Sequence, residues 1–377
     1  MAENNLELTR NQKEVELFFG PNHPGMHGNF SVHLKLEGDT VVQAEPVPGF
    51  LHRGFEKLME RRLWMSNLAL IPRICVPEPD INEMVYAMAV ERLSELQVPP
   101  RGNWIRVLIL ELARINAHLM SIGGLGGASG LYTDMYWAMT ERDWILDIFE
   151  KITGARVYHM YIVIGGVRQD LPEGIVPFIL ERLDGLERRL KEFHDLLYKN
   201  PVLHARLKDR LILNRSMCEE MCITGIGLRA TGIPHDIRRV DPYAAYEEMD
   251  FDIPTGEKGD ALTRGHLKLL EVEQSIRIIR QVLAKIPSGP VRQKPLGNAL
   301  RWRVPAGETF EHVESSRGEY GYYVVSDGSE KPYRIHVRGA SYPQGLYGVQ
   351  RYMPGTRIED VALWLGTMDF CPPEIDR

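Results

Sequence analysis

Two short segments, separated by most of the chain, each place a cysteine and a glutamate three residues apart. The first is Arg73-Ile74-Cys75-Val76-Pro77-Glu78-Pro79-Asp80, and the second is Asp369-Phe370-Cys371-Pro372-Pro373-Glu374-Ile375-Asp376-Arg377. A Cys-x-x-Cys pair can hold a metal because both thiolates converge on one centre. A carboxylate in place of the second thiolate keeps a negative charge but removes a soft ligand. We call each of these Cys-x-x-Glu segments a half-pair. The two half-pairs are the first candidates for a catalytic or metal-binding site.

Two other segments carry groups that can move protons or hold an anion. His23 and His27 lie in a loop rich in glycine and proline, and loop histidines titrate near neutral pH. Arg53 and Glu56 lie at the expected start of a helix, where the arginine could stabilise an electron-rich centre and the glutamate could relay protons. The alternatives are a loop that hydrogen-bonds to itself and ordinary surface ion pairs.

Other sequence patterns give weaker evidence for a functional site. Cys218 and Cys222 are one helical turn apart without further ligands at usable spacing, which favours a structural pair of buried thiols over a metal site. The segment 123–127 is rich in glycine, but no strand precedes it and no Gly-Lys-Ser/Thr follows, so it predicts a helix terminus that allows close packing. No nucleophile elbow, zinc-protease motif or dinucleotide fingerprint is present.

Composition is typical of a soluble globular protein. Of 377 residues, 44% are hydrophobic and 25% charged, and 45 basic against 51 acidic residues give a net charge of −6, which does not suggest nucleic acid as a partner. No apolar run approaches the roughly 20 residues that span a bilayer. The first residues are polar and acidic, unlike a secretory signal, and the low cysteine content favours a reducing cytosol.

Hydrophobic periodicity predicts strands at both ends and long helices between them. Alternation predicts strands over 15–19, 30–36 and 41–44, and a hairpin over 322–337. Asp80, with Glu83 three residues on, has the spacing of a helix-capping box. The expected helices begin near 51 and then cover 80–98, 104–123, 132–153, a segment from 155, 173–199, 260–286 and 358–365.

This order predicts an α+β fold, in which a central antiparallel helical bundle is flanked by small N-terminal and C-terminal β-sheets. The predicted parts are an N-terminal sheet with the histidine loop over 1–50, a helical core over 51–300, and a C-terminal hairpin with the cysteine-bearing tail over 301–377. We expect the three parts to form one integrated unit.

Seven segments in the same order resemble one superfamily along almost the whole chain. It comprises the large catalytic subunit of nickel–iron hydrogenases and the 49-kilodalton subunit of respiratory complex I. The matching segments are 20–28, 51–58, 86–93, 154–156, 165–172, 318–321 and 325–334. The resemblance implies a fold like that of the nickel–iron hydrogenase large subunit.

The chain departs from the hydrogenase pattern at its metal ligands. Membrane-bound hydrogenases of this superfamily hold nickel and iron with two Cys-x-x-Cys pairs, which correspond here to Cys75/Glu78 and Cys371/Glu374. A nickel–iron centre needs soft thiolate donors, so we expect it to be absent. We also expect no other cofactor to be bound by this chain alone.

The chain departs from the complex I pattern on the quinone side. His27 matches the loop histidine proposed to protonate quinone, but the pocket tyrosine falls at Val76 and the aspartate coupled to that histidine at Ala128. Arg53 matches the arginine beside the terminal iron–sulfur cluster. Tyr158 occupies the position of a cluster-facing histidine, and His159 follows it.

Within the superfamily, the chain most resembles the archaeal, ferredoxin-dependent group that lacks nickel–iron and reduces sulfane sulfur or polysulfide. The resemblance implies a [4Fe–4S] cluster in an adjacent small subunit and ferredoxin as the ultimate donor. It also implies a complex-I-like membrane channel subunit, other hydrophilic-arm subunits, ion pumping, and a peripheral position on the cytoplasmic face of the cell membrane. No nucleic acid and no transmembrane segment of its own are expected.

The candidate roles follow. A thiolate of Cys75 or Cys371 could attack polysulfide, while Glu78, Glu374 or Glu56 supplies protons. The substrate side would include His23, His27, Arg73 and Val76, and the cluster-facing side Arg53 and His159. The alternative is that both thiols are inert remnants of a lost metal site.

Two other functions stay open from the sequence. One is the same scaffold with a quinone-like acceptor, as in NADH or coenzyme F420H2 dehydrogenases. The other is a non-catalytic coupling subunit that transmits redox-driven motion to its membrane neighbours.

Overall fold

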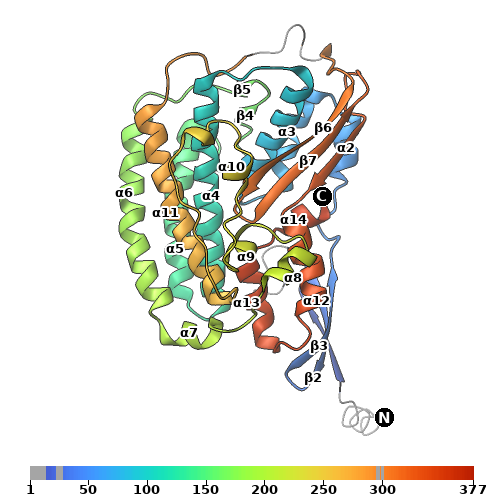
Figure 1. Ribbon diagram of the computed structural model, residues 1–377, viewed down its shortest axis with the longest axis vertical. Coiled ribbons are helices and arrows are strands. Elements are labelled where there is room, and N and C mark those ends of the chain that lie inside the picture. Colours follow the sequence, from blue (N-terminus) through green and yellow to red (C-terminus); the bar gives the residue numbers. More distant parts are fainter. Residues whose placement is uncertain (1–13, 23–28, 294–297, 299–300) are drawn as a thin grey trace.

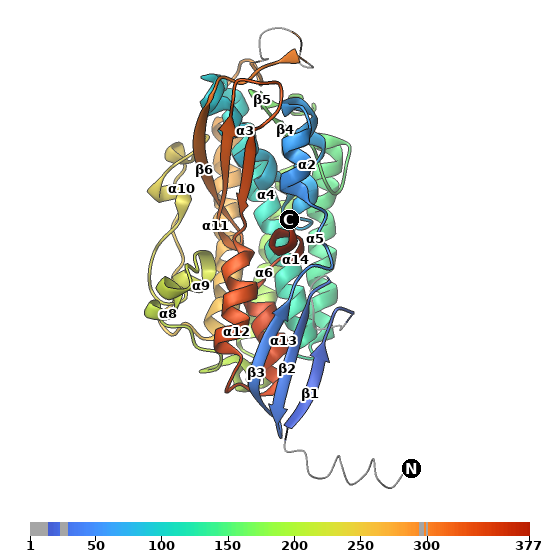
Figure 2. The ribbon, with the colours of Figure 1, turned by 90° about the vertical axis from the view of Figure 1, so that its right-hand side faces the viewer.

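The computed structural model describes residues 14–22, 29–293, 298 and 301–377. Five long helices form a bundle, with two small antiparallel sheets against one flank (Figures 1 and 2). The long helices are α3 (Pro79–Ser94), α4 (Pro100–Ala128), α5 (Tyr132–Thr153), α6 (Ile175–Phe193) and α11 (Ala261–Lys285). This arrangement confirms the predicted α+β class, with a helical bundle flanked by small sheets.

Helix α4 is the centre of the bundle. Its buried residues cover all faces of the helix, as expected for an element surrounded by others, and α5 and α11 pack along it. Helix α6 lies outside, because Ile179, Leu183, Leu186 and Leu190 form one buried stripe opposite a charged face. The outer helices therefore isolate α4 from solvent and make it a rigid support.

The two sheets are built from the ends of the chain. Strands β1 (Glu14–Phe19), β2 (Ser31–Glu37) and β3 (Thr40–Val47) form one, and β6 (Gly307–Ser315), β7 (Gly318–Ser326) and β8 (Arg334–Arg338) form the other, both in sequential antiparallel order. A two-residue pair, β4 (Ile162–Val163) with β5 (Gly166–Val167), lies after α5. The three N-terminal strands were predicted, whereas the C-terminal sheet was predicted as a hairpin that corresponds to β7 and β8, to which β6 adds a third strand.

Short helices connect these parts. They are α2 (Phe55–Arg61), η1 (Trp64–Ala69), η2 (Ile71–Ile74), η3 (His194–Tyr198), α7 (Pro201–Leu207), α8 (Arg215–Glu220), α9 (Gly225–Arg229), α10 (Ile237–Val240), η4 (Tyr246–Glu248), η6 (Pro343–Gly348), α12 (Val349–Tyr352), α13 (Ile358–Met368) and α14 (Pro372–Asp376). Helix α14 lies between the two sheets in Figure 2. Among the described residues, none of the helices has the length and apolar character needed to cross a bilayer.

Three local predictions were wrong. Asp80 does not cap α3, because Glu78 holds that position and the Asp80 carboxylate binds His159 instead. Helix α4 continues through the glycine-rich segment to Ala128, although the close packing expected there is present. No helix begins at Ala155, because the chain there forms an irregular segment that leads into β4.

Hydrogen bonds join the C-terminal tail to the segment between β3 and α2. The carboxylate of Asp376 accepts from the backbone N–H groups of Gly49 and Leu51, each at 2.7 Å. Phe30, after the N-terminal loop, contacts the ring of Phe370 in an edge-to-face arrangement. The C-terminal segment is therefore held beside the segment that leads into α2.

Asp134, in the first turn of α5, is a buried carboxyl group. Its side chain lies against Gly126, where an added Cβ would be 2.3 Å from Oδ2, and neither carboxyl oxygen has a hydrogen-bond partner among the described residues. Burial, followed by the charge of Glu141, raises the pKa of Asp134 to about 8. The folded protein therefore binds a proton here that the unfolded chain releases above about pH 4.

Replacing Asp134 by asparagine should flatten the pH dependence of stability. Wild-type stability should decrease as pH rises from about 4 to about 8, because the folded protein retains the proton over that window. Asp134→Asn removes this contribution and should raise Tm at pH 8 by on the order of 5 °C. Thermal unfolding at pH 5 and pH 8 measures the effect, with the exposed Asp143→Asn on the same helix as control. Equal behaviour of both variants would contradict the assignment.

Candidate functional site

The structure brings the two half-pairs together. Cys75 is the C-cap residue of η2, and Cys371 is the N-cap residue of α14, which begins with Pro372 and Pro373. The sulfur atoms of Cys75 and Cys371 and a carboxylate oxygen of Glu374 all lie within 4.8 Å of one another, and all three residues are buried. We call the group of Cys75, Glu78, Arg317, Cys371 and Glu374 the cradle.

Glu78 is bound to Ser316 and is not part of the cluster that Cys75, Cys371 and Glu374 form. At the N-cap of α3, its carboxylate accepts from the backbone N–H of Ser316 at 3.0 Å and from the Ser316 hydroxyl at 2.7 Å. Glu374 is likewise held, because Oε2 accepts from the hydroxyl of Ser341 at 2.5 Å. The same hydroxyl oxygen accepts from the backbone N–H of Cys371 at 2.8 Å. Both carboxylates are therefore fixed by serines from the C-terminal part of the chain.

Arg317 lies at the centre of the cradle. It stands in the turn between β6 and β7, and only 3% of its surface is exposed. Its guanidinium is 3.8 Å from the Cys75 sulfur, 3.5 Å from Glu78 and 3.7 Å from Glu374. A fourth contact, of 3.9 Å, reaches Asp369. One cation thus contacts all the acidic groups of the cradle and one of its thiols.

Burial changes the proton affinity of these groups. Desolvation, with contributions from Cys371 and Glu374, raises the pKa of the Cys75 thiol well above its usual value, although Arg317 opposes the shift. Desolvation also raises the pKa of Glu78 to about 7, against the lowering effect of Arg114 and Arg317. At neutral pH the Cys75 thiol therefore holds its proton, and Glu78 can both take up and release one.

The residues of the cradle do not fit a nickel–iron centre. Such a centre needs four thiolates, and here two positions are carboxylates. Glu78 is turned to Ser316, and the guanidinium of Arg317 lies close to the remaining donors, where its positive charge opposes a metal ion. The guanidinium supplies the positive charge that a metal would bring.

The outer wall of the cradle is cationic and aromatic. The guanidinium of Arg73 lies 5.4 Å from the ring centre of Tyr158, and Arg53 donates to the Arg73 carbonyl at 3.0 Å. Burial raises the pKa of Tyr158, and both cradle thiols contribute, which places its phenol near them. Val76, next to Cys75, is 38% exposed. These residues occupy the side of the cradle that faces solvent in the isolated chain.

The predicted cluster-facing histidine is engaged in structural contacts. His159 is buried, stacks on Phe149 at 3.9 Å, and directs its two ring nitrogens to Asp80 and to the Arg156 carbonyl. It is Tyr158, rather than His159, that lies at the outer wall.

Glu56 links three parts of the chain. Its carboxylate accepts from the Val337 N–H at 2.9 Å and pairs with Arg334 and Arg377. Burial raises the pKa of Glu56, but these partners outweigh it and the net shift is downward, so this glutamate is ionised at neutral pH. Its contacts fix α2 and α14 against β8.

Two histidines and two cysteines complete the candidates from the sequence. His23 and His27 are outside the described residues. Cys218 is buried but Cys222 is exposed, because α8 ends at Glu220 and the backbone turns away, so the expected pair of buried thiols is wrong.

Sequence reasoning missed Arg317, Ser316 and Ser341. Arg317 directly precedes the matching segment 318–321, so its position next to a recognised motif was the available signal. Nothing local distinguishes the two serines. Their role depends on the distant carboxylates that they bind.

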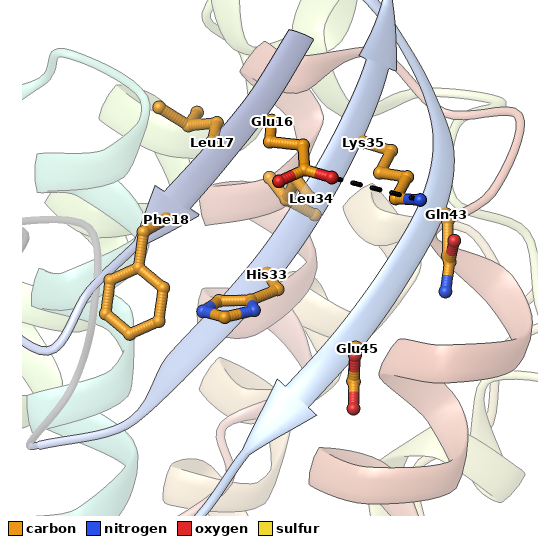
Figure 3. A pocket seen from close by; sticks show the side chains of 8 residues that line it. All are labelled: Glu16, Leu17, Phe18, His33, Leu34, Lys35, Gln43 and Glu45. Atoms are coloured by element: carbon orange, nitrogen blue, oxygen red, sulfur yellow. Dashed lines mark ion pairs between the residues drawn. The ribbon is translucent and has the colours of Figure 1, made fainter. Parts of the chain in front are cut away.

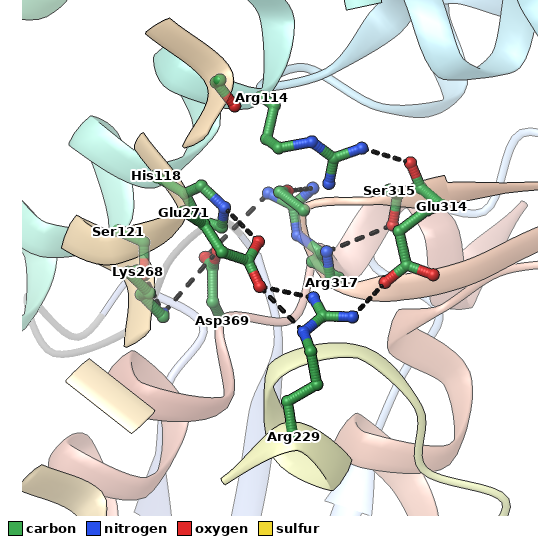
Figure 4. A network of polar contacts seen from close by, with 12 residues as sticks. Arg114, His118, Ser121, Arg229, Lys268, Glu271, Glu314, Ser315, Arg317 and Asp369 are labelled. Carbon is green, nitrogen blue, oxygen red and sulfur yellow. Dashed lines mark hydrogen bonds and ion pairs between the residues drawn. The ribbon is translucent and has the colours of Figure 1, made fainter. Parts of the chain in front are cut away.

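The cradle continues into a buried polar network (Figure 4). The carboxylate of Asp369 is 3.8 Å from the Lys268 ammonium, and the Lys268 ammonium donates to the hydroxyl of Ser121. Deeper in the bundle, Glu271 accepts from Arg229 at 2.9 Å and contacts His118 at 3.0 Å. Lines of charged side chains thus extend from the cradle along α4 and α11.

A separate hollow lies on the N-terminal sheet (Figure 3). Its volume is about 290 Å³, and strands β1, β2 and β3 line it, with Phe18 and His33 in edge-to-face contact and Lys35 near Glu16. It contains none of the cradle residues.

Comparison with known proteins identifies the family. Residues 129–377 match the family described as "Respiratory-chain NADH dehydrogenase, 49 Kd subunit". The chain belongs to this 49-kilodalton subunit family. It is 62% identical to an NADH-quinone oxidoreductase subunit of Thermosipho melanesiensis, over 97% of this chain and all of that protein. It is 37% identical to an F(420)H(2) dehydrogenase subunit of Methanosarcina mazei, over 99% of this chain and all of that protein.

A solved structure supports the assignment to the 49-kilodalton family. A chain of the archaeal membrane-bound sulfane sulfur reductase, described as a respiratory membrane complex, superimposes with a TM-score of 0.94 and 45% identity, over 97% of this chain and 99% of that chain. The protein is thus a 49-kilodalton-type oxidoreductase subunit of the respiratory-chain class.

Removing the central cation of this 49-kilodalton subunit should destabilise it strongly. Arg317→Met leaves buried carboxylates without a counter-charge and should cost about 3–5 kcal/mol of unfolding free energy. The loss should be largest near pH 8 and smaller near pH 5, where carboxyl groups with raised pKa values, such as Glu78, are protonated. Denaturant unfolding measures it.

Two control variants define the effect of Arg317. Arg317→Lys keeps the charge and should lose less stability than Arg317→Met. Arg351→Met removes an exposed arginine whose guanidinium lies 3.9 Å from the Glu220 carboxylate. This variant should change the free energy of unfolding by about 0.5 kcal/mol or less. A similar cost for Arg317→Met and Arg351→Met would show that the cradle does not need the cation.

Proposed function

We propose that this chain is the catalytic large subunit of a membrane-bound respiratory oxidoreductase that reduces sulfane sulfur or polysulfide and lacks a nickel–iron centre. Electrons would come from reduced ferredoxin through a [4Fe–4S] cluster in an adjacent small subunit. A complex-I-like membrane subunit would couple the reaction to ion pumping, with this chain peripheral on the cytoplasmic face. The observation that carries the proposal is the meeting of two buried thiols beside a guanidinium and a carboxylate.

The cradle offers what a sulfur chain requires. A polysulfide is an anion, and the guanidinium of Arg317 supplies a fixed positive charge beside the Cys75 sulfur. Arg53 and Arg73 extend this positive charge to the outer wall. The likeness to the sulfane sulfur reductase complex also supports a sulfur acceptor.

The first step is attack on the sulfur chain. One cradle thiol gives its proton to Glu374 and attacks a polysulfide Sₙ²⁻ at an S–S bond. That bond breaks, a shortened chain Sₙ₋₁²⁻ leaves, and the cysteine carries a persulfide anion. The proton transfer is needed because burial keeps the Cys75 thiol protonated.

The second thiol resolves the persulfide. It attacks the cysteine-bound sulfur, a disulfide forms between Cys75 and Cys371, and hydrosulfide leaves with the proton of the second thiol. Two electrons from the partner cluster, the proton on Glu374 and one further proton then restore both thiols. The sum is Sₙ²⁻ + 2e⁻ + H⁺ → Sₙ₋₁²⁻ + HS⁻.

A quinone-like acceptor is the second candidate. It is favoured by the 62% identity to a protein named as part of an NADH-quinone oxidoreductase. Because position 76 is a valine and not a tyrosine, such an acceptor would take its hydrogen bonds from other groups at the outer wall, such as the phenol of Tyr158, whose pKa both cradle thiols raise. A non-catalytic coupling role would require neither thiol.

Substituting either cradle thiol should abolish sulfur reduction. The intact complex, supplied with reduced ferredoxin, is offered polysulfide, a quinone or protons, and we expect turnover with polysulfide. Cys75→Ala or Cys371→Ala should lower this rate by at least about 100-fold, because each thiol forms a covalent bond in the cycle. Cys222→Ala, which removes an exposed thiol, should leave the rate unchanged.

The acceptor screen separates the candidates. Turnover with quinone alone would favour the second function. Polysulfide turnover that persists in both alanine variants would mean that the thiols are inert remnants.

The purified complex should lack stoichiometric nickel. Two carboxylates and a nearby guanidinium replace the soft donor set that the metal needs. Elemental analysis of the assembled complex measures the content, with a nickel–iron hydrogenase as positive control. One nickel per complex would overturn the argument from the donor set.

A further inference from the structure

A buried lysine lies at the base of the cradle and has no role in the chemistry above. Lys268, on α11, is 1% exposed. Its ammonium donates to the hydroxyl of Ser121 on α4 and to the Gly366 carbonyl, the latter at 3.2 Å, and lies 3.8 Å from the carboxylate of Asp369 (Figure 4). Three separate elements therefore meet around one ammonium group.

The position of Lys268 connects it to the reacting groups. Asp369, its carboxylate partner, is on the same segment as Cys371 and lies 3.9 Å from Arg317. Arg317 in turn contacts the Cys75 sulfur and Glu374. An unbroken series of polar contacts thus leads from the lysine to both half-pairs.

Arg317 itself cannot supply protons, because a guanidinium does not lose its proton in a protein. A lysine ammonium can, once burial weakens its hold on the proton. In the series that runs from Lys268 through Asp369 to Arg317, Lys268 is the cation able to do so. Arg317 is therefore a permanent positive charge, whereas Lys268 can exchange its proton.

Burial tunes Lys268 for this exchange. Desolvation lowers the pKa of Lys268 to about 8; Asp369 opposes this shift and Arg317 adds to it. At pH 7 the side chain is thus mostly protonated, and little free energy is needed to remove the proton. An ordinary exposed lysine, with a pKa near 10.4, would be a weaker donor.

We propose that Lys268 stores a proton and releases it towards the cradle when the cradle is reduced. Lys268 acts through the carboxylate of Asp369, which lies on the Cys371 segment, and Arg317 holds that carboxylate without taking part in the proton transfer. Lys268 is therefore a proton-storing residue that does not touch the acceptor. The ammonium becomes a neutral amine, the proton ends on a cradle thiolate, and solvent later restores the ammonium. This inference rests on the proposed function, since it supplies the further proton of the reductive step.

The charged groups that face Lys268 set its pH dependence. They come from α4, α11, the β6–β7 turn and the segment after α13, and they are His118, Arg264, Glu271, Arg317 and Asp369. His118 pairs with Glu271, and Arg264 donates to the Leu211 and Gly259 carbonyls. Lys268 is therefore the group of this set expected to exchange its proton near pH 8.

The test compares a proton-retaining variant with a neutral one. Lys268→Arg keeps the positive charge but cannot release a proton, and Lys268→Met removes both. With reduced ferredoxin and polysulfide, Lys268→Arg should lower the turnover of the assembled complex by about 10- to 100-fold, and raise the solvent isotope effect. Lys285→Arg, an exposed position on the same helix, should match the wild type.

The pH profile separates proton storage from structural support. Wild-type turnover should fall as pH rises through about 8, because the ammonium that donates is lost above its pKa. Lys268→Arg should lose this fall and be slow at every pH. Unchanged turnover with an unchanged profile in Lys268→Arg would overturn the proposal, and so would a slow rate that keeps the wild-type profile.

Failure of the proposed function is recognised separately. A wild-type complex that does not reduce polysulfide contradicts the function, and the Lys268 variants are then compared with the acceptor that the complex does reduce. Because that reduction also takes up protons, the same loss of rate and of the pH fall is expected. Assembly and Tm of each variant, measured in parallel, identify a folding defect; if Lys268→Met does not assemble, Lys268→Arg alone decides.

Discussion

The contacts of one buried guanidinium hold the candidate site together. Arg317 lies within 4 Å of three carboxylates and one thiol, which come from two segments far apart in the sequence. Bringing such acids together in a dry interior without a cation would cost several kcal/mol for each ionised group. With the cation present, the acids remain close enough to act on one another and on the thiols. In the site proposed here, which lacks a nickel–iron centre, this guanidinium supplies the positive charge.

The fold explains why this cluster can form. Helix α4 is buried on all sides, and its polar residues pair with residues from α10, α11 and the β6–β7 hairpin. These pairs anchor the hairpin that presents Arg317. The tail that carries Cys371 is held by Asp376 against the segment before α2, and Glu56 pairs with Arg377. Precise placement of the thiols is thus achieved by contacts outside the cradle.

Periodicity in the sequence predicted the fold more completely than it predicted the site. Helix α5 ends where Gly154 adopts a left-handed conformation, and the β7–β8 hairpin follows its turn residues, so local chemistry was sufficient there. The capping role given to Asp80 was wrong because a tertiary partner, His159, takes its carboxylate. Arg317 escaped notice for the same reason: an arginine in a turn has no distinctive local pattern until its distant partners are known.

The exchange of thiolates for carboxylates also changes what the site can store. A metal centre accommodates an added electron by changing oxidation state at nearly fixed geometry. A pair of thiols accommodates two electrons by breaking a disulfide, and each thiol formed requires a proton. Carboxyl groups with raised pKa values, such as Glu78, and a buried amine, Lys268, are then necessary companions of the thiols. On the proposed function, the absence of a nickel–iron centre and the presence of proton-exchanging groups around the cradle are two aspects of the same thiol chemistry.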